Sequence, residues 1–471
     1  MAVGELTEET QLLVIGGGPG GYVAAFRAAD LGIETTLVDQ ADTLGGVCLR
    51  EGCVPSKALL HVAHLIESAG EASGYGVTFN TPDVDVTRLR EWKQSVIDKL
   101  CGGVKKLAKK RRIRVIQGRA RFEDSQTVGV DGSDPTHMRF KDAIIATGSS
   151  PKFLPAEIMP ADCCMSAADA LDLPDIPGTL LVVGGGYIGL ELGQVYALLG
   201  SQVTVVEALP HVMTGCDADL ARPLLARLRK QFAAIHVNAQ LESARRSDAG
   251  IEVSFSVRDK RHSETFERVL SSVGRYPNSA DLGLENTRVT INEYGFIEAD
   301  KTLRTSEKHI YAIGDVIGNP MLAHKASREG IVAAEVIAGK PSVFEARAIP
   351  AVVYSSPEIA WCGITEAEAK EQNLSIKIGK FRWGANSRAL TMGRPAGTTK
   401  IIADAESQRV LGVGIVGEHA GDLIAEAVLA MEMGATVKDL ARTIHPHPTT
   451  SETIMEAAES VFGSAIHAYS G

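Results

Sequence analysis

Two cysteines with four residues between them, Cys48 and Cys53, stand in the stretch GGVCLREGCVPSK, residues 45–57. Such a pair can form a redox-active disulfide, or it can be two buried thiols without chemistry. No third Cys or His lies nearby, so a metal site is not expected. A regular helix would separate the two positions by about 7.5 Å of rise, too far for a disulfide, but the flanking glycines permit a distorted backbone. Lys57, one turn past Cys53, could stabilise a thiolate or contact a cofactor.

A histidine near the C-terminal end is a candidate acid–base group. In TIHPHPTTSETI, Glu452 follows His447 by five residues, so its carboxylate can orient the imidazole and stabilise the protonated form. The same glutamate also fits a capping box, because Thr449-x-x-Glu452 precedes a helix-like run through IMEAAESVF. The local sequence leaves both interpretations open. His445 is a weaker candidate because it has no acid at a matching distance.

These side chains need elements to position them, and the clearest one is a glycine-rich turn near the N-terminus. Residues 11–40 pass from an apolar run through Gly16-x-Gly18-x-x-Gly21 into a helix-like segment, and Asp39 follows 18 residues after the last glycine. The glycines permit a tight turn and a close approach, and the start of the helix offers N–H groups to a pyrophosphate. The acid can accept hydrogen bonds from ribose hydroxyls. This strand–turn–helix pattern is typical of dinucleotide binding.

The pattern occurs a second time in residues 179–208. Its glycines are Gly184, Gly186 and Gly189, and Glu207 again follows 18 residues after the last. One copy could be an ordinary turn, but two copies with the same spacing predict two dinucleotides. Glu207 predicts NAD rather than NADP, because a carboxylate repels a 2′-phosphate and no arginine follows it closely. With two dinucleotide sites in the chain, the redox interpretation of the cysteine pair is favoured.

Three further apolar segments end in residues suited to ligand contact. FKDAIIATGSSP carries Thr147 and Gly148, RVLSSVGRYPN carries Gly274, and HIYAIGDVIG carries Asp315. Each could be an ordinary turn, and Asp315 could cap a helix that begins near Met321. Together they predict strand ends that converge on ligands.

The composition fits a large globular protein. Its 471 residues predict about three domains. The net charge of -10 and pI near 5.7 argue against a nucleic-acid partner. No apolar run reaches roughly 18 residues, so no membrane partner is expected. The acidic start MAVGELTEET lacks the features of a signal or transit peptide, which makes the cytoplasm the expected compartment. Seven cysteines, an odd number, do not suggest a disulfide framework, and those outside the pair are expected to be partly buried small side chains, including Cys163 and Cys164.

Together these segments resemble the two-cysteine flavoprotein disulfide reductases over essentially the whole chain. The motifs that carry the resemblance are GGGPGG, GGVCLREGCVPSKALL, GGGYIGLELG, IYAIGDVIGNPMLAHKA and TIHPHPTTSE. The resemblance is greatest to members that oxidise protein-bound dihydrolipoamide with NAD. It implies an α/β fold with two Rossmann-like domains: an FAD-binding domain with the redox disulfide over 1–150 and an NAD-binding domain over 151–274. A central segment over 275–346 would complete the FAD site, and an α+β interface domain would occupy 347–471.

The resemblance implies a role for each residue around the thiols. Cys48 would be the interchange thiol that attacks the substrate, and Cys53 the charge-transfer thiol beside the flavin. Lys57 would lie near the flavin and pair with Glu191, the acid inside GLELG.

The resemblance also implies how the protein assembles. His447, held by Glu452, would be the acid–base group and would reach the active site of the other subunit. An obligate homodimer follows, because a monomer would lack its base. The implied partner is a lipoyl-carrying protein of an oxoacid dehydrogenase or glycine cleavage complex.

The implied cofactor contacts follow the same motifs. Asp39 would bind the FAD ribose and Asp315 the ribityl chain. The other implied FAD contacts are Gly16, Gly18, Gly21, Lys57, Ala120, Thr147, Gly148 and the backbone of Met321, Leu322, Ala323 and His324. The implied NAD contacts are Gly184, Gly186, Gly189, Glu207 and Gly274.

Some positions depart from the family pattern and leave the substrate open. Arg50-Glu51 stands where relatives usually carry Asn and an apolar residue. An NADPH-dependent reductase of a glutathione-type disulfide is the nearest alternative, and Glu207 and VPSK, residues 54–57, argue against it. A mercuric reductase is disfavoured because a C-terminal cysteine pair is missing. A non-catalytic, redox-sensing flavoprotein subunit is disfavoured by the intact set of two cysteines and His447.

Overall fold

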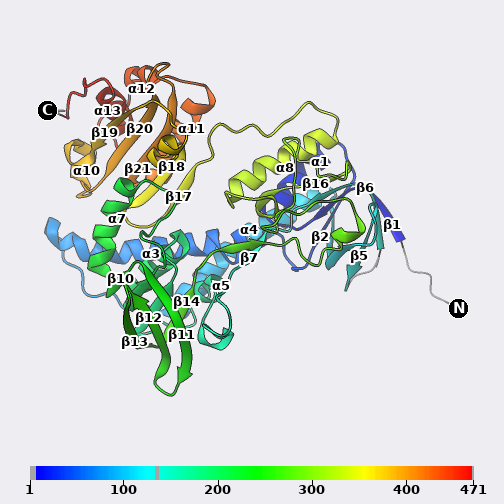
Figure 1. Ribbon diagram of the computed structural model, residues 1–471, viewed down its shortest axis with the longest axis horizontal. Helices are drawn as coiled ribbons and strands as arrows, with labels where there is room; N and C mark the ends of the chain where they lie inside the picture. Colours follow the sequence, from blue (N-terminus) through cyan, green and yellow to red (C-terminus); the bar gives the residue numbers. More distant parts are fainter. Residues whose placement is uncertain (1–6, 133–136, 469–471) are drawn as a thin grey trace. The chain divides into compact units, whose positions relative to one another are not determined.

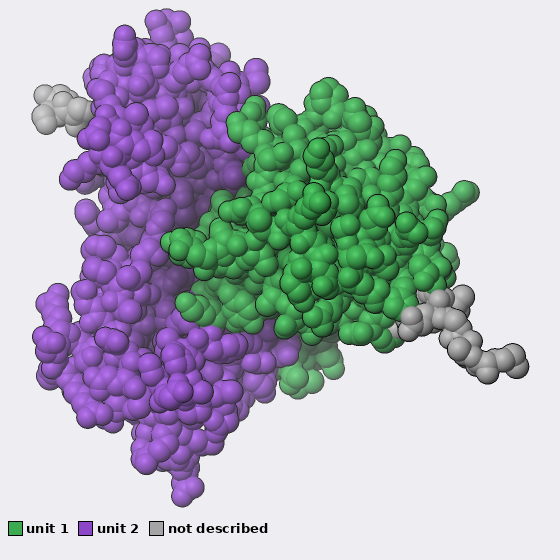
Figure 2. All heavy atoms as spheres, turned by 45° about the vertical axis from the view of Figure 1, so that its right-hand side comes forward, with its two compact units in different colours: residues 1–58, 85–152, 274–345 green, residues 59–84, 153–273, 346–471 purple. Residues whose placement is uncertain are grey.

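The computed structural model of this protein describes residues 7–132 and 137–468, and the chain divides into two compact units. Unit 1 comprises residues 1–58, 85–152 and 274–345, and unit 2 comprises 59–84, 153–273 and 346–471 (Figure 2). Each unit is assembled from three separate stretches of chain. Residues that form one site can therefore be far apart in the sequence.

Unit 1 is built on a seven-stranded sheet with the order β3-β2-β1-β6-β5-β4, in which β16 also pairs with β6 (Figure 1). Strands β1, β2, β3, β6 and β16 are parallel, whereas β4 and β5 are antiparallel. The strands are β1 (Thr7–Ile15), β2 (Thr35–Asp39), β3 (Arg114–Gln117), β4 (Arg119–Phe122), β5 (Thr127–Asp131), β6 (His137–Ile145) and β16 (Ile310–Ala312). A separate antiparallel pair joins β7 (Ser149–Pro151) to β15 (Arg275–Pro277).

Strand β1 has buried side chains on both faces of the sheet. Successive side chains of a strand point to opposite faces, so β1 contributes to two cores. Leu12 and Val14 belong to the core formed with the helices, and Leu13 and Ile15 to the core formed with β4 and β5. The helices of unit 1 are α1 (Pro19–Asp30), α2 (Gly46–Arg50), α4 (Val86–Lys110) and α8 (Ala323–Ile337). A further helix, α3 (Cys53–Glu71), begins in unit 1 and continues in unit 2. This doubly covered parallel sheet explains the continuous apolar run before the first glycine turn.

The first half of unit 2 holds a second parallel sheet with the order β10-β9-β8-β14. A three-stranded antiparallel sheet, β11-β12-β13, packs on it, and Leu181 and Val183 share a core with Val253 and Phe255. The strands are β8 (Thr179–Val183), β9 (Gln202–Val206), β10 (Ala234–His236), β11 (Ala239–Ser247), β12 (Gly250–Val257), β13 (Lys260–Phe266) and β14 (Arg268–Ser271). The helices are α5 (Ala167–Leu171), α6 (Tyr187–Leu199) and α7 (Ala218–Gln231).

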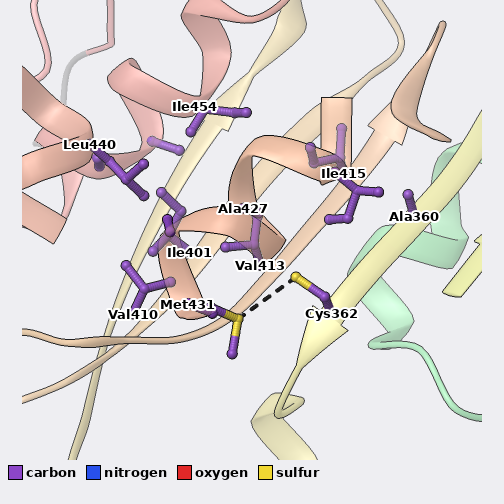
Figure 3. Close-up of a cluster of buried hydrophobic side chains, with 14 of the residues drawn as sticks. Ala360, Cys362, Ile401, Val410, Val413, Ile415, Ala427, Met431, Leu440 and Ile454 are labelled. Atoms are coloured by element: carbon purple, nitrogen blue, oxygen red, sulfur yellow. Dashed lines mark hydrogen bonds between the residues drawn. The ribbon is translucent and has the colours of Figure 1, made fainter. Parts of the chain in front are cut away.

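The C-terminal part of unit 2 is an antiparallel five-stranded sheet with helices packed on it, in the order β17-β18-β21-β20-β19. Its core contains Cys362, whose thiol lies 3.7 Å from the sulfur of Met431 (Figure 3). The strands are β17 (Ala351–Val353), β18 (Glu358–Gly363), β19 (Ile376–Arg382), β20 (Thr398–Asp404) and β21 (Val410–Gly417). The helices are α9 (Glu366–Glu371), α10 (Ser387–Thr391), α11 (Ala420–Glu432), α12 (Val437–Arg442) and α13 (Glu452–Ser460).

The architecture confirms the predicted class: two Rossmann-like parallel sheets and a C-terminal α+β sheet. The helix expected near Met321 begins at Ala323. Short 3-10 helices are η1 (Ala72–Tyr75), η2 (Ala161–Cys163), η3 (Leu284–Asn286), η4 (Gly314–Ile317) and η5 (Trp383–Ala385). Among the helices of residues 7–132 and 137–468, none has both the length and the apolar character that a membrane crossing requires.

Candidate active site

The first glycine turn, residues 16–21, joins β1 to α1 in unit 1. Gly16 has a φ of +105°, and a Cβ at this position would lie 2.3 Å from the carbonyl oxygen of Ala146. A Cβ on Gly21 would meet the carbonyl oxygen of Gly16. Packing of the protein itself therefore requires the first and third glycines. Gly18 differs, because its Cβ would come no closer than 3.8 Å to any neighbour.

The second glycine turn, residues 184–189, joins β8 to α6 in unit 2 and repeats this geometry. Gly184 also has a φ of +105°, and its Cβ would lie 2.5 Å from the carbonyl oxygen of Ser272. A Cβ on Gly189 would lie 2.4 Å from the carbonyl oxygen of Gly184, whereas one on Gly186 would meet nothing within 4 Å. In both turns the middle glycine leaves open space at the start of a helix. This space fits the close approach of a pyrophosphate to the backbone.

The two acids that follow these turns are held in the same way. Asp39 accepts hydrogen bonds from the amide of Gly17 and, at 2.8 Å, from the amide of Ala41. Glu207 accepts from the amide of Gly185 at 2.6 Å and from the amide of Leu209 at 2.7 Å. Each carboxylate is thus fixed beside its turn and keeps lone pairs for ribose hydroxyls. These donors and acceptors fit one dinucleotide in each unit.

Asp315 lies in η4, which follows β16 of the unit 1 sheet, and it does not cap α8. Ser149 donates a hydrogen bond of 2.5 Å to its carboxylate, and Arg275 donates to the Ser149 hydroxyl at 2.7 Å. Helix α8 has Leu322 as its N-cap, without a side-chain cap. The capping interpretation of Asp315 is therefore wrong, and its carboxylate is instead oriented by a serine.

Other predicted FAD contacts gather around the ends of the same parallel strands. The ends of β1, β6 and β16 are aligned, since Ile15 and Ala312 are both register partners of Ile145. Thr147, just beyond β6, donates to the carbonyl of Asn278 at 2.7 Å. Ala120 lies on β4, next to Gly118, whose amide donates to the Asp39 carbonyl at 2.8 Å. The remaining predicted FAD contacts are Gly148, at the turn after β6, and Met321, Leu322, Ala323 and His324, at the start of α8. Gly274, a predicted NAD contact, lies just before β15 in unit 1.

The cysteine pair sits at a break between two helices of unit 1. Helix α2 ends at Arg50, and α3 begins at Cys53, so the chain does not form one regular helix through the pair. Cys48 is half-buried and Cys53 is exposed, and both are present as thiols. The predicted backbone distortion is confirmed: Gly46 has a φ of +58°, and a Cβ there would lie 2.5 Å from the Cα of Gly18. This close approach places the cysteine segment directly against the first glycine turn.

The surroundings of the two thiols separate their acidities. A hydrogen bond to Cys53 raises the pKa of Cys48, and burial and the charge of Cys53 raise it further, whereas Lys57 works in the other direction. Cys53 is the first residue of the 19-residue helix α3, where the helix dipole stabilises an anion. The start of α3 thus favours an anion at position 53, whereas the surroundings of Cys48 favour its protonated form.

The two residues predicted to support the thiols belong to different units. Lys57 lies on α3, one turn beyond Cys53, on the same side of the helix. Glu191 is buried in α6, and its carboxylate accepts a hydrogen bond of 2.8 Å from the amide of Tyr354. The pairing of Lys57 with Glu191 stays a prediction.

The predicted acid–base pair forms at the start of α13. The Nδ1 atom of His447 lies 2.9 Å from Oε1 of Glu452, and Oε2 accepts a hydrogen bond of 2.8 Å from the amide of Thr449. Burial works to raise the pKa of Glu452, but the Thr449 amide and the His447 ring outweigh it, and the pKa is lowered. The helix has Ser451 as its N-cap, so the capping box itself is not formed. The His447 side chain is 71% exposed.

Two nearby features escaped the sequence-based reasoning. His445, expected to lack an acid, has Nε2 2.8 Å from Oε1 of Glu426 on α11, and this contact raises the pKa of the imidazole. Lys400, 1% exposed, contacts three carboxylates at 2.5–2.9 Å: Asp217, Asp219 and Glu366. The partners come from elements far apart in the chain, so no local motif signals them.

Comparisons with known proteins agree with this geometry. Residues 10–330 match the pyridine nucleotide-disulphide oxidoreductase family, and residues 349–458 match the dimerisation domain of that family. The chain is 45% identical to proteins named dihydrolipoyl dehydrogenase from Haloferax volcanii and Bacillus subtilis, with 99% of each chain covered in both cases.

Two solved structures share the fold over nearly the full length. One is LpdA from Mycobacterium tuberculosis, with a TM-score of 0.87 and 27% identity over 96% of this chain and 99% of that one. The other is the flavoprotein disulfide reductase RclA from Escherichia coli, as its Cu(II) complex, with a TM-score of 0.83 and 27% identity over 94% and 98% of the two chains.

Proposed function

This chain belongs to the pyridine nucleotide-disulphide oxidoreductase family, and from that premise we propose that it is a dihydrolipoyl dehydrogenase. It oxidises protein-bound dihydrolipoamide to lipoamide with NAD as the electron acceptor. The observation that carries the proposal is the thiol pair, hydrogen-bonded and seated against a dinucleotide turn, in a chain 45% identical to named dihydrolipoyl dehydrogenases.

In the proposed reaction the chain's own groups move protons and exchange thiols. Nδ1 of His447 faces Glu452, so Nε2 takes the proton of one substrate thiol. The resulting thiolate attacks the sulfur of Cys48 in the Cys48–Cys53 disulfide, and the bond between the two cysteines breaks with Cys53 leaving as a thiolate. The second substrate thiol attacks the substrate sulfur now bonded to Cys48, and its proton passes to the departing Cys48 sulfur. Lipoamide leaves, and Cys48 remains as a thiol.

The difference in acidity between the thiols supports these roles. A thiolate is a better leaving group where its charge is stabilised, and the start of α3 provides that at Cys53. The raised pKa of Cys48 favours its protonation once the substrate has left. The half-reaction is balanced: the substrate dithiol loses two electrons and two protons, and the cysteine disulfide gains two electrons.

Two cofactors complete the reaction. FAD would be held in unit 1 by Asp39, the first glycine turn and Asp315, and NAD in unit 2 by Glu207 and the second glycine turn. When bound, FAD accepts the two electrons of the cysteine thiols and NAD takes them as hydride. Glu207 supports NAD over NADP, because its charge repels a 2′-phosphate.

We also propose that the protein works as a homodimer in which His447 serves the partner subunit's thiol pair. The match to the dimerisation domain and the 71% exposure of His447 support this arrangement. The lipoyl group would be presented by a carrier protein of an oxoacid dehydrogenase or glycine cleavage complex. A cytoplasmic location remains a prediction from the sequence.

The first test is the initial rate of nucleotide reduction by dihydrolipoamide, with NAD and NADP compared and Cys48→Ser as the control. Fast turnover with NAD alone, abolished in Cys48→Ser, supports the proposal. A yellow, dimeric protein without turnover would contradict it and would favour a non-catalytic flavoprotein. Turnover with NADPH and another disulfide would instead favour the reductase alternative.

A further inference from the structure

A further histidine–carboxylate pair, His467 and Glu456, lies one turn along α13 from the His447–Glu452 pair. The segment that follows α13 brings His467 back to the helix, where Nδ1 lies 2.5 Å from Oε1 of Glu456 and the backbone amide lies 3.4 Å from Oε2. Glu456 has a side chain only 4% exposed, whereas the His467 ring is 66% exposed. Glu456 follows Glu452 by four residues, so the two carboxylates share one face of α13.

The buried Glu456 needs a positive charge close by, and His467 supplies it. An ionised carboxylate with so little access to water is unfavourable unless it is paired. The hydrogen bond to Glu456 raises the pKa of His467, and the charges of Glu452 and Glu459 add to this effect. When His467 is protonated, the pair contributes little net charge beside Glu452. Without the imidazolium, the uncompensated charge of Glu456 would lie one turn from the group that orients His447.

Several of the other charged groups around this helix have partners elsewhere. His445 faces Glu426 and also interacts with the charge of Glu452. Helix α13 packs on α12, β19 and β20. The charged residues on these elements are Lys438, Asp439 and Arg442 on α12, Lys377, Lys380 and Arg382 on β19, and Lys400 and Asp404 on β20. Of these, Lys380 and Lys400 contact Asp219 and Glu366, and Asp439 bonds to Thr436.

We propose that His467 and Glu456 are a positioning pair for the acid–base histidine: the imidazolium of His467 neutralises Glu456 and so limits the negative field that Glu452 and His447 experience. The pair does not touch the substrate. It sets the pH range over which His447 can act as a base. This inference rests on the proposed function only in taking His447 as the catalytic base. The electrostatic coupling between the His467–Glu456 pair and His447 does not depend on which reaction the protein catalyses.

The test compares three variants of the full-length, FAD-loaded protein. In His467→Gln the Glu456 charge is left uncompensated, the field at His447 becomes more negative, and its protonated form is favoured. The titration midpoint of His447 should rise by about half a pH unit. In Glu456→Gln the carboxylate is lost, so the midpoint should stay or fall. The double variant should return to within about 0.2 unit of the native value, because both charges are gone.

Two readouts separate this inference from the proposed function. The midpoint is measured by NMR with isotopically labelled histidine, with the His447 resonance assigned by its loss in His447→Gln, and it needs no turnover. The pH dependence of kcat/KM for dihydrolipoamide should then shift by the same amount. A rise in His467→Gln together with no rise in Glu456→Gln supports the proposal. An unchanged midpoint in His467→Gln, or an equal rise in Glu456→Gln, would overturn it and indicate a structural role only.

Discussion

At the scale of single residues, the protein places carboxylates where they fix other groups. Asp39 and Glu207 each accept hydrogen bonds from two backbone amides and thereby hold a glycine turn. Glu452 accepts from one amide and orients His447. Both oxygens of Asp39 and of Glu207 accept a backbone amide, whereas in Glu452 one oxygen accepts an amide and the other faces His447. An oxygen that accepts one hydrogen bond keeps a lone pair for a ligand or a proton-transfer partner.

The first prediction concerns the choice between NAD and NADP. Replacing Glu207 by Gln keeps an oxygen that can accept hydrogen bonds but removes the charge that repels a 2′-phosphate. The ratio of kcat/KM for NAD to that for NADP should fall by about tenfold, which corresponds to roughly 1.4 kcal/mol of discrimination. Steady-state kinetics with both nucleotides measure the ratio. Asp39→Asn is the matched control in the other unit, and an equal fall in that variant would contradict the assignment.

At the scale of elements, the two strand–turn–helix segments show how one local design is used twice. The first and third glycines are required by contacts within the protein, whereas a Cβ at the middle glycine would clash with no neighbour. Stability and ligand binding are thus assigned to different glycines of one motif.

This division gives a second prediction, on Gly184 and Gly186. Gly184→Ala should lower the melting temperature, because its Cβ would lie 2.5 Å from the Ser272 carbonyl at a φ of +105°. Gly186→Ala should melt like the native protein but bind NAD at least about tenfold more weakly, since a methyl group would occupy the space in front of the turn. Thermal unfolding and calorimetric NAD binding measure the two effects. Destabilisation by both changes alike would show that the middle glycine is also structural.

A third prediction concerns the Lys400 cluster, which joins the start of α7, α9 and β20. Lys400→Met removes a buried ammonium and leaves three carboxylates together, which should cost about 3–5 kcal/mol of stability and lower the melting temperature markedly. Lys380 shares Asp219 and Glu366 but is 42% exposed, so Lys380→Met should have a much smaller effect. Similar losses in both variants would contradict this account.

The pKa values of the carboxyl groups determine how the difference in stability between the native protein and Lys400→Met depends on pH. Burial works to raise the pKa values of Asp219 and Glu366, but Lys380 and Lys400 outweigh it and lower them. A carboxyl group with a lowered pKa stabilises the fold at pH values above its pKa in the unfolded chain, which is near 4. This stabilisation is lost as the pH falls through the pKa of the group in the folded protein. The difference between native and Lys400→Met protein should therefore persist down to about pH 4 and shrink below it.

The sequence predicted the local parts of this site and missed those that depend on distant elements. Both glycine turns, their acids and the His447–Glu452 contact lie within short windows and follow fixed spacings. The partner of His445 comes from another helix, and the partners of Lys400 lie up to 183 residues away. The sequence indicates the start of α8, at Ala323, only as near Met321, because no side-chain cap marks it. Contacts of this kind arise only once helices pack on sheets.

At the scale of the whole molecule, the proposed active site needs two chains. The fourth prediction therefore uses hybrid dimers of Cys48→Ser and His447→Gln subunits, each inactive alone. One of the two sites in the hybrid combines native cysteines with a native His447, so activity should return to about half of the native value per dimer. Subunits with two different affinity tags allow the hybrid to be purified and assayed. The control hybrid, Cys48→Ser with Cys53→Ser, has no intact thiol pair and should stay inactive.

An inactive Cys48→Ser and His447→Gln hybrid would show that His447 does not serve the partner subunit. Activity in the control hybrid would show instead that subunits exchange during the assay.

The two glycine turns also differ in what closes around them. Gly16 lies against Ala146, Gly18 is approached by Gly46, and Gly20 packs on Ala326, so three distant segments surround the first turn. Beyond its own strand and helix, the second turn is approached by Ser272 and by Glu207 and Val212, which belong to one stretch of chain. A ligand enclosed by many segments departs only when they open together. We therefore expect a nucleotide at the first turn to dissociate more slowly than one at the second, which a consumed co-substrate must leave in each catalytic cycle.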